Sequence, residues 1–255
     1  MMKQIYAFES IQDFENYKDE IDLLNKKLKT YKELLINQFE LIELPKSIVW
    51  TSSKNATTVF SQVPVPAYTN RETIYMSPSV SEWKAFYLSQ LDGEDLEHND
   101  EIQYIKNYFQ SLTIDDVFCI LAHELTHHIE LFPDEFEDER NNSIWFEEGM
   151  CEYLSQRMTL SEQRYNELRK NENLLIKLFK PKYGGFSLDD FGAGSYHQTS
   201  LASIMLNYWR STVAIHFLVE CRYEGDVKKV FSKYEEWHEK GRQQPLTEYF
   251  DVEKF

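Results

Sequence analysis

Cysteine and basic residues are scarce in this sequence of 255 residues, and each shortage counts against a class of protein. The chain has three cysteines, an odd and sparse set that cannot form the disulfide framework of a small secreted protein. Lysine and arginine number 27 against 43 aspartates and glutamates, which gives a net charge of −16. This acidic balance argues against a nucleic-acid partner and against binding to an anionic membrane surface.

Long apolar runs and glycine-rich phosphate loops are missing as well. No apolar stretch reaches membrane length, and the start MMKQIYAFES lacks the basic-then-apolar pattern of a secretion signal. We therefore expect a cytoplasmic protein with no membrane partner. Residues 181–197 hold four of the eight glycines, but no strand leads into them and no Lys-Ser/Thr follows, so they form no phosphate loop. They are expected to be either a mobile rim over a cleft or a plain connection between helices.

The strongest chemical signal is the string HELTH at 123–127, which fits the H-E-x-x-H pattern of metal hydrolases. Thr113 followed by Asp116 resembles a capping box and predicts the start of a helix that Pro133 stops. His123 and His127 are four residues apart, so on this helix they point the same way and can bind one ion.

A site with two imidazoles and room for water suits catalytic zinc. Glu124 is rotated by about 100° from His123 on the same helix, so it cannot easily be a third ligand. Its carboxylate can instead reach a water at the metal.

A third ligand is predicted in the stretch WFEEGMCEYL at 145–154. A helix there would present Glu148 to the first helix and complete a His, His, Glu zinc site. Glu152 lies on the same face, where it can accept the second ring N–H of a ligand histidine and fix its tautomer. Glu147 is rotated away from that face and is expected at the surface.

The stretch 113–156 resembles the gluzincins, the thermolysin and aminopeptidase N type of zinc metallopeptidases, in which HExxH is followed after about twenty residues by W-x-x-E-G-x-x-x-Y. The resemblance implies that His123, His127 and Glu148 bind Zn²⁺ and that Glu124 is the general base. It also implies a peptide or protein substrate.

The same resemblance extends to a helix at 208–218, YWRSTVAIHFL, whose first residue would be the tyrosine that stabilises the oxyanion. By this comparison Tyr208 has that role, and His197 is the lower-ranked alternative. The G-x-M-E-N element with which aminopeptidase-like members hold a free amino terminus does not occur. An endopeptidase is therefore favoured over an aminopeptidase.

The remaining pattern predicts an α+β fold, and the resemblance implies that this fold is gluzincin-like. Long helices are expected over 9–42, and further helices over 80–91, over 100–111 and almost throughout the chain after 142. Short strands are expected at 47–51, 57–62 and 72–77, in a small and mostly antiparallel sheet. The last of these is either an edge strand that binds an extended peptide or an ordinary strand of the sheet.

We expect one bilobal catalytic unit. Residues 1–141 would form an α+β lobe that carries the N-terminal helices, the small sheet and the HExxH helix, and 142–255 a helical lobe. Three other functions stay open from the sequence: a zinc hydrolase of a non-peptide substrate, a catalytically weak peptidase-like protein that binds a polypeptide, and a structural metal site. The intact Glu124 argues against the last two, because neither needs a general base.

Overall fold

The computed structural model describes the chain except for residues 1, 62–63, 92–99, 137, 139 and 198–199 and the side chain of His197. The chain forms two compact units, one made of 1–130 with 154–168 and the other of 131–153 with 169–255. The lobes expected at 1–141 and 142–255 stay a prediction, because the units are defined by compactness alone. Residues 92–99, an acidic stretch that contains His98 and that the sequence predicts to be a solvated loop, lie outside the described residues.

The first unit is built on a four-stranded sheet with the strand order β1-β2-β4-β3. Its strands are β1 (Lys3–Ala7), β2 (Ser47–Thr51), β3 (Ala67–Thr69) and β4 (Thr73–Met76). β1 pairs with β2 and β2 with β4 in parallel, whereas β3 pairs with β4 antiparallel. The fold is therefore α+β as predicted, but the prediction of a mostly antiparallel sheet is wrong.

The direction of the strands follows from their connections. Parallel neighbours need a long crossover, and α1 (Ile11–Gln38) supplies it between β1 and β2. The strand β1 gives no strong pattern in the sequence and was not expected. β4 lies between β2 and β3, so 72–77 is an ordinary strand of the sheet and cannot be its edge.

The expected strand at 57–62 is wrong for a different reason. The chain is helical up to Phe60, with α2 (Ser53–Asn55) followed by the π-helical turn η1 (Ala56–Phe60), and residue 62 lies outside the described residues. The hydroxyl of Thr57 donates to the carbonyl of Ser53 at 2.9 Å, and that of Thr58 donates to Lys54 at 2.6 Å. These side chain to backbone bonds satisfy the threonines within a helix, although their β-branched shape favours strands.

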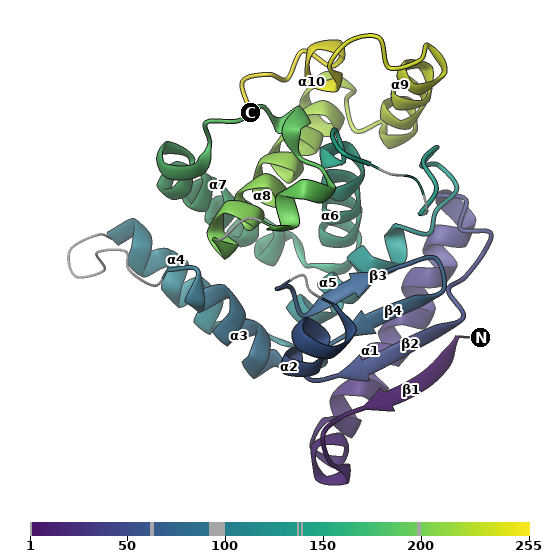
Figure 1. Cartoon of the computed structure of the whole chain (residues 1–255), viewed down its shortest axis with the longest axis vertical. Coiled ribbons are helices and arrows are strands. Elements are labelled where there is room, and N and C mark those ends of the chain that lie inside the picture. Colours follow the sequence, from purple (N-terminus) through teal and green to yellow (C-terminus); the bar gives the residue numbers. More distant parts are fainter. Residues whose placement is uncertain (1, 62–63, 92–99, 137, 139, 198–199) are drawn as a thin grey trace. The chain divides into compact units, whose positions relative to one another are not determined.

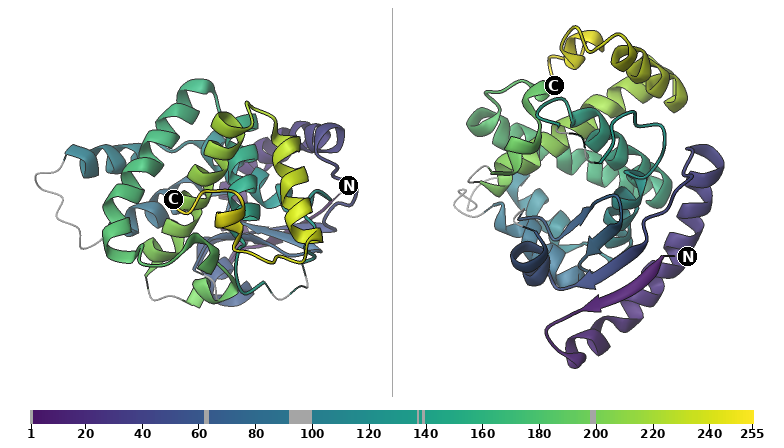
Figure 2. Two further views of the ribbon diagram at one scale, coloured as in Figure 1. Left: turned by 90° about the horizontal axis from the view of Figure 1, so that it is seen from above. Right: turned by 45° about the vertical axis from the view of Figure 1, so that its right-hand side comes forward.

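Three further helices of the first unit, α3 (Val80–Ser89), α4 (Asp100–Gln110) and α5 (Ile114–Thr126), lie where helices were predicted. α1 and α5 run side by side behind the sheet in Figure 1, and Figure 2 shows α1 alongside β1. The buried face of α1 consists of Ile21, Leu24, Leu28, Tyr31 and Leu35. The Tyr31 hydroxyl lies 2.7 Å from that of Thr126, which fixes the end of α5 against α1.

The second unit is largely helical, as expected for the chain after 142. Its elements are α6 (Trp145–Thr159) up to Tyr153, α7 (Glu162–Tyr183) from Arg169, η2 (Leu188–Asp190), η3 (Ala193–His197), α8 (Leu201–His216), η4 (Phe217–Arg222), α9 (Val227–Glu239) and α10 (Leu246–Tyr249). An aromatic core holds these elements together. The ring of Phe146 stacks on those of Tyr234 and Phe250, with ring centroids 3.9 Å and 5.6 Å apart. No helix in the described part of the chain is long and apolar enough to cross a membrane.

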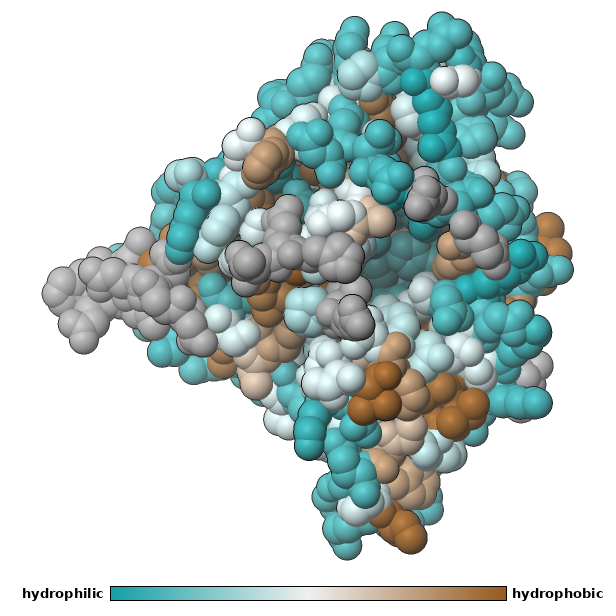
Figure 3. All heavy atoms as spheres, in the orientation of Figure 1, coloured by the Kyte–Doolittle hydropathy of each residue, from teal (hydrophilic) through white to brown (hydrophobic). Residues whose placement is uncertain are grey.

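Exposed hydrophobic side chains of the first unit lie on β1, at the start of α1 and on η1. Those on these three elements are Ile5, Tyr6, Ile11, Val59 and Phe60, and Leu23, Ile36, Ile42 and Met158 are exposed elsewhere in the unit. On the face drawn in Figure 3, hydrophobic side chains gather in the region of the sheet, among a mostly hydrophilic surface. This region is the part of the first unit best suited to contact another apolar surface.

Candidate metal centre

The helix α5 begins with the predicted capping box. The backbone N–H of Thr113 donates to the carboxylate of Asp116 at 2.7 Å, and the Thr113 hydroxyl accepts from the N–H of Asp115 at 3.3 Å. Asp116 also accepts a hydrogen bond from Nε of Arg164 at 2.7 Å. These contacts fix the start of the helix and thus the rotation of its histidines.

The helix ends earlier than the proline at 133 suggested. α5 stops at Thr126, and His127 is its C-cap, with φ −56° and ψ −17°. The N–H groups of His128 and Ile129 bond to carbonyls three residues earlier, the usual tightening of a last helical turn. Because His127 keeps a helical backbone, its ring still shares a face with His123.

The two histidine rings meet through their Nε2 atoms, which lie 3.1 Å apart. His123 is buried and His127 is half-buried. Two nitrogens bound to zinc at about 2.05 Å in tetrahedral geometry would be about 3.3 Å apart, which is close to this separation. An N–H···N hydrogen bond between the two rings would give a similar distance. A third metal-binding side chain nearby is therefore needed to favour a metal site over a simple hydrogen bond.

That third donor is Glu148. One ligand atom each from His123, His127 and Glu148 lies within 4.8 Å of the other two, and the carboxylate side chain is buried. The helix α6 that carries Glu148 continues into the first unit, where Ser155 accepts a hydrogen bond from the thiol of Cys119, one turn before His123. A buried carboxylate beside two imidazoles is a donor set that fits zinc, and the residues present therefore fit a metal.

Two phenols approach the Glu148 carboxylate within the second unit. The hydroxyl of Tyr208, predicted from the family resemblance, lies 3.4 Å from Oε1 of Glu148. The hydroxyl of Tyr196 donates to the same oxygen at 2.9 Å. Tyr196 was missed by sequence reasoning: it is one of 16 tyrosines and lies in a glycine-rich segment without periodicity. The side chain of the alternative, His197, lies outside the described residues.

Glu124 and Glu152 are the remaining predicted residues. Glu124 lies on α5 directly after His123. Its side chain is buried, with 7% of the residue exposed. Glu152 is half-buried, one turn after Glu148 on α6. The roles of general base and orienting carboxylate stay predictions for these two residues.

Glu147 departs from expectation, because it is buried rather than at the surface. It is 4% exposed and forms an ion pair with Arg140. Burial alone would lower the pKa of Arg140, but the charge and the hydrogen bond of Glu147 outweigh it and raise that pKa. Arg140 therefore stays charged, and the pair anchors the chain that leads into α6.

His128 follows the second candidate ligand and belongs to a different environment. Its Nε2 lies 2.8 Å from the hydroxyl of Thr69 on β3. Burial, and then the charge of His127, lower the pKa of His128 to about 3. The ring is therefore neutral near pH 7, and it ties the end of α5 to the sheet.

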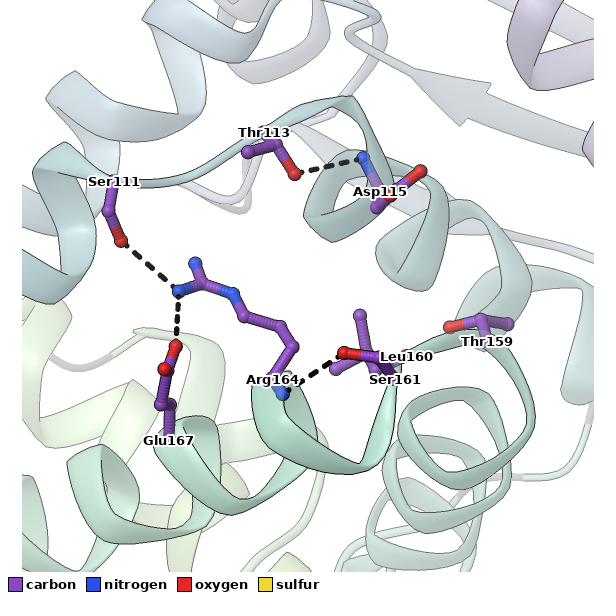
Figure 4. Close-up of a pocket in the computed structure, with 8 residues that line it drawn as sticks. All are labelled: Ser111, Thr113, Asp115, Thr159, Leu160, Ser161, Arg164 and Glu167. Carbon is purple, nitrogen blue, oxygen red and sulfur yellow. Dashed lines mark hydrogen bonds and ion pairs between the residues drawn. The ribbon is translucent and has the colours of Figure 1, made fainter.

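A polar pocket of about 350 Å³ lies in the first unit where α5 and α7 begin (Figure 4). It is lined by Ser111, Thr113, Asp115, Thr159, Leu160, Ser161, Arg164 and Glu167, and by none of the candidate ligands. Nη1 of Arg164 donates to Ser111 at 3.1 Å and to Glu167 at 3.3 Å, in addition to its bond to Asp116. The carboxylates of Asp116 and Glu167 already balance the charge of Arg164. The lining of this pocket therefore gives no indication of a bound ligand.

No family model, curated protein or solved structure matches this chain. The metal centre therefore stands on the residues and on their geometry.

Proposed function

We propose that the protein is a zinc-dependent metallopeptidase that hydrolyses peptide bonds. One observation carries the proposal: the donor atoms of His123, His127 and Glu148 lie within 4.8 Å of one another, with Glu124 buried on the same helix as both histidines. A structural metal site needs no acid or base beside its ligands, whereas a hydrolase does.

Each residue has a defined chemical task in this proposal. His123, His127 and Glu148 would hold the zinc ion, which would supply Lewis-acid chemistry for activating a water and polarising the scissile carbonyl. Glu124 accepts a proton from the attacking water and then delivers it to the leaving nitrogen. Burial of Glu124 keeps bulk water from competing for that proton.

Tyr208 is the proposed donor to the charge that develops on the carbonyl oxygen. Its hydroxyl is 3.4 Å from the Glu148 carboxylate, which brings a neutral O–H within reach of atoms around the metal position. A preorganised donor of this kind stabilises charge that appears only during the reaction. Glu152 is proposed to orient a ligand histidine by accepting its second ring N–H.

The substrate is proposed to be a peptide or protein cleaved internally, because the sequence lacks the G-x-M-E-N element that binds a free amino terminus. The three cysteines form no disulfide bond, which supports a reducing compartment such as the cytoplasm. The acidic net charge of −16 supports a protein partner over a nucleic acid.

A peptide-library cleavage assay, run with and without a metal chelator, tests the function. We expect cleavage that the chelator abolishes and added zinc restores. Glu124→Gln should keep zinc and lose about 10²- to 10⁴-fold in turnover, the range of general acid–base catalysis. The matched control is Glu130→Gln, the same change at an exposed glutamate after α5, which should leave turnover unchanged.

Full activity of the Glu124→Gln variant would refute the role of general base. Zinc binding by the wild-type protein without any cleavage would favour a polypeptide-binding protein or a hydrolase of another substrate.

A further inference from the structure

The Glu148 carboxylate is held by a pair of tyrosines that contact each other. The hydroxyls of Tyr196 and Tyr208 lie 2.8 Å apart, and both approach Oε1 of Glu148, at 2.9 Å and 3.4 Å. All three residues belong to the second unit, on η3, α8 and α6. The contact of Tyr196 is thus the shorter of the two, although only Tyr208 was expected at this site.

Counting donors limits where the protons of this triangle lie. An ionised carboxylate only accepts hydrogen bonds, and each phenol has one proton to donate. Tyr196 gives its proton to Glu148, so the single proton of Tyr208 goes either to the oxygen of Tyr196 or to the same carboxylate oxygen. Tyr196 therefore contacts both Glu148 and Tyr208, and its phenol oxygen is one of the two acceptors that fix where the O–H of Tyr208 points.

The short helix η3 that carries Tyr196 is held in place by backbone pairing with the segment before α6. The N–H groups of Ser143 and Ile144 donate to the carbonyls of Asp189 at 2.8 Å and Phe191 at 3.1 Å. The N–H of Ala193 donates back to Arg140 at 2.9 Å. The segment that bears Tyr196 is thereby bound to the segment that leads into α6 and Glu148.

Gly192 makes this close approach possible. A Cβ at that position would lie 2.1 Å from the carbonyl oxygen of Asn141, so any larger residue would force the two segments apart. The hydroxyl of Ser195 closes the turn by accepting from the N–H of Gly192 at 3.2 Å. Of the two alternatives for residues 181–197, the plain connection between helices describes this part better than a mobile rim.

We infer that Tyr196 is a positioning residue of the metal centre: its phenol holds the Glu148 carboxylate for the metal and holds the Tyr208 hydroxyl ready for the reacting oxygen. The inference rests on the metal site of the proposed function but not on its peptide substrate. Groups that hydrogen-bond to a metal ligand fix its orientation, and their loss costs about 10- to 100-fold in metal affinity.

Zinc affinity, measured by competition with a chromophoric chelator, tests the inference without using turnover. Tyr196→Phe should weaken zinc binding by about 10- to 100-fold. Tyr208→Phe should change it by less than about threefold, because the shorter bond from Tyr196 to Glu148 remains. The control is Tyr223→Phe at a half-buried tyrosine of the same unit, which should bind zinc like the wild type. Phenylalanine keeps the ring of the half-buried Tyr196, and far-UV circular dichroism checks that the variant is folded.

Turnover then separates positioning from a merely structural role. Tyr208→Phe should lower kcat strongly in the wild-type background and much less in the Tyr196→Phe background, because Tyr196 acts through Tyr208. Losses in kcat from Tyr196→Phe and Tyr208→Phe that are fully additive in free energy would contradict the coupling of the two tyrosines.

The possible outcomes distinguish this inference from the proposed function. Unchanged zinc affinity in a folded Tyr196→Phe variant would overturn the inference even if the protein is a peptidase. Weakened zinc binding in a protein that cleaves no peptide would support the inference and refute the peptidase. A wild-type protein that binds no zinc would overturn both.

Discussion

Replacing Gly149 by alanine is expected to destabilise the second unit and to impair the site, although alanine is the better helix former. Gly149 directly follows Glu148 on α6. A Cβ at this position would lie 2.6 Å from the backbone carbonyl oxygen of Ser211 and 2.8 Å from Cγ1 of Ile215. Both residues belong to α8, the helix that carries Tyr208. Gly149 therefore allows α6 and α8 to approach until their backbones are in contact.

The magnitude follows from the size of this overlap. Ordinary contacts of a Cβ begin at 3.4 Å, so α8 would have to retreat by about 0.8 Å in a close-packed interior. Overpacking of this kind costs about 1–3 kcal/mol. The gain in helix propensity from glycine to alanine is about 1 kcal/mol. We expect a net loss of up to about 2 kcal/mol in the free energy of unfolding.

The same displacement should affect catalysis. Ser211 lies one helical turn after Tyr208, so a shift of α8 at this point moves the Tyr208 phenol relative to Glu148. A misplacement of about 1 Å can cost about 10²-fold in rate. We therefore expect the turnover of Gly149→Ala to fall by at least about tenfold, with zinc still bound.

Urea denaturation followed by circular dichroism measures the stability change. The control is Gly185→Ala, since a Cβ there meets no atom within 4 Å and the backbone is not left-handed. It should stay within about 0.5 kcal/mol of the wild type. The reasoning would be refuted if Gly149→Ala were stabilised by about 1 kcal/mol, as an unhindered helical glycine would be.

Two further predictions concern the ends of the site helices. Thr113→Ala removes the capping box of α5 and should cost about 1 kcal/mol in urea denaturation; a change near zero would mean that the cap does not hold the helix. Arg140→Met leaves the buried carboxylate of Glu147 without its ion pair and should cost about 3–5 kcal/mol, with a lower thermal midpoint. Thermal unfolding at the wild-type midpoint would contradict the account of this pair.

The grouping of His123, His127 and Glu148 could be predicted because it depends on local spacing. Two histidines four residues apart on a helix must share a face, and Glu148 lies on a second helix that the sequence marks clearly. Tyr196 could not be predicted. Its contact with Glu148 arises from backbone pairing between 140–144 and 189–193, segments about fifty residues apart with no periodic pattern.

Burial around α6 could not be predicted either. Reasoning from a helical wheel assigned Glu147 to the surface, because it is rotated by about 100° from Glu148. That reasoning assumes a helix with one exposed side. Residues 143–150 are all buried, so the beginning of α6 is enclosed on every side and Glu147 needs the charge of Arg140.

The sheet shows what composition can and cannot determine. β2 and β4 were found because valine, isoleucine, tryptophan and tyrosine favour extended chain. Their parallel direction depends on the path of the chain that connects β2 to β4. Residue composition carries no information about that path. The segment 57–62 has the same favourable composition, but the bonds of Thr57 and Thr58 to preceding carbonyls favour a helix, which extends to Phe60.

The central claim is that His123, His127 and Glu148 bind one zinc ion. Elemental analysis of the purified wild-type protein beside Glu148→Ala and Glu130→Gln tests this most directly. The account predicts about one zinc per chain in the wild type and in Glu130→Gln, and little or none in Glu148→Ala under the same dialysis. Stoichiometric zinc in Glu148→Ala, or no metal in the wild type, would contradict it.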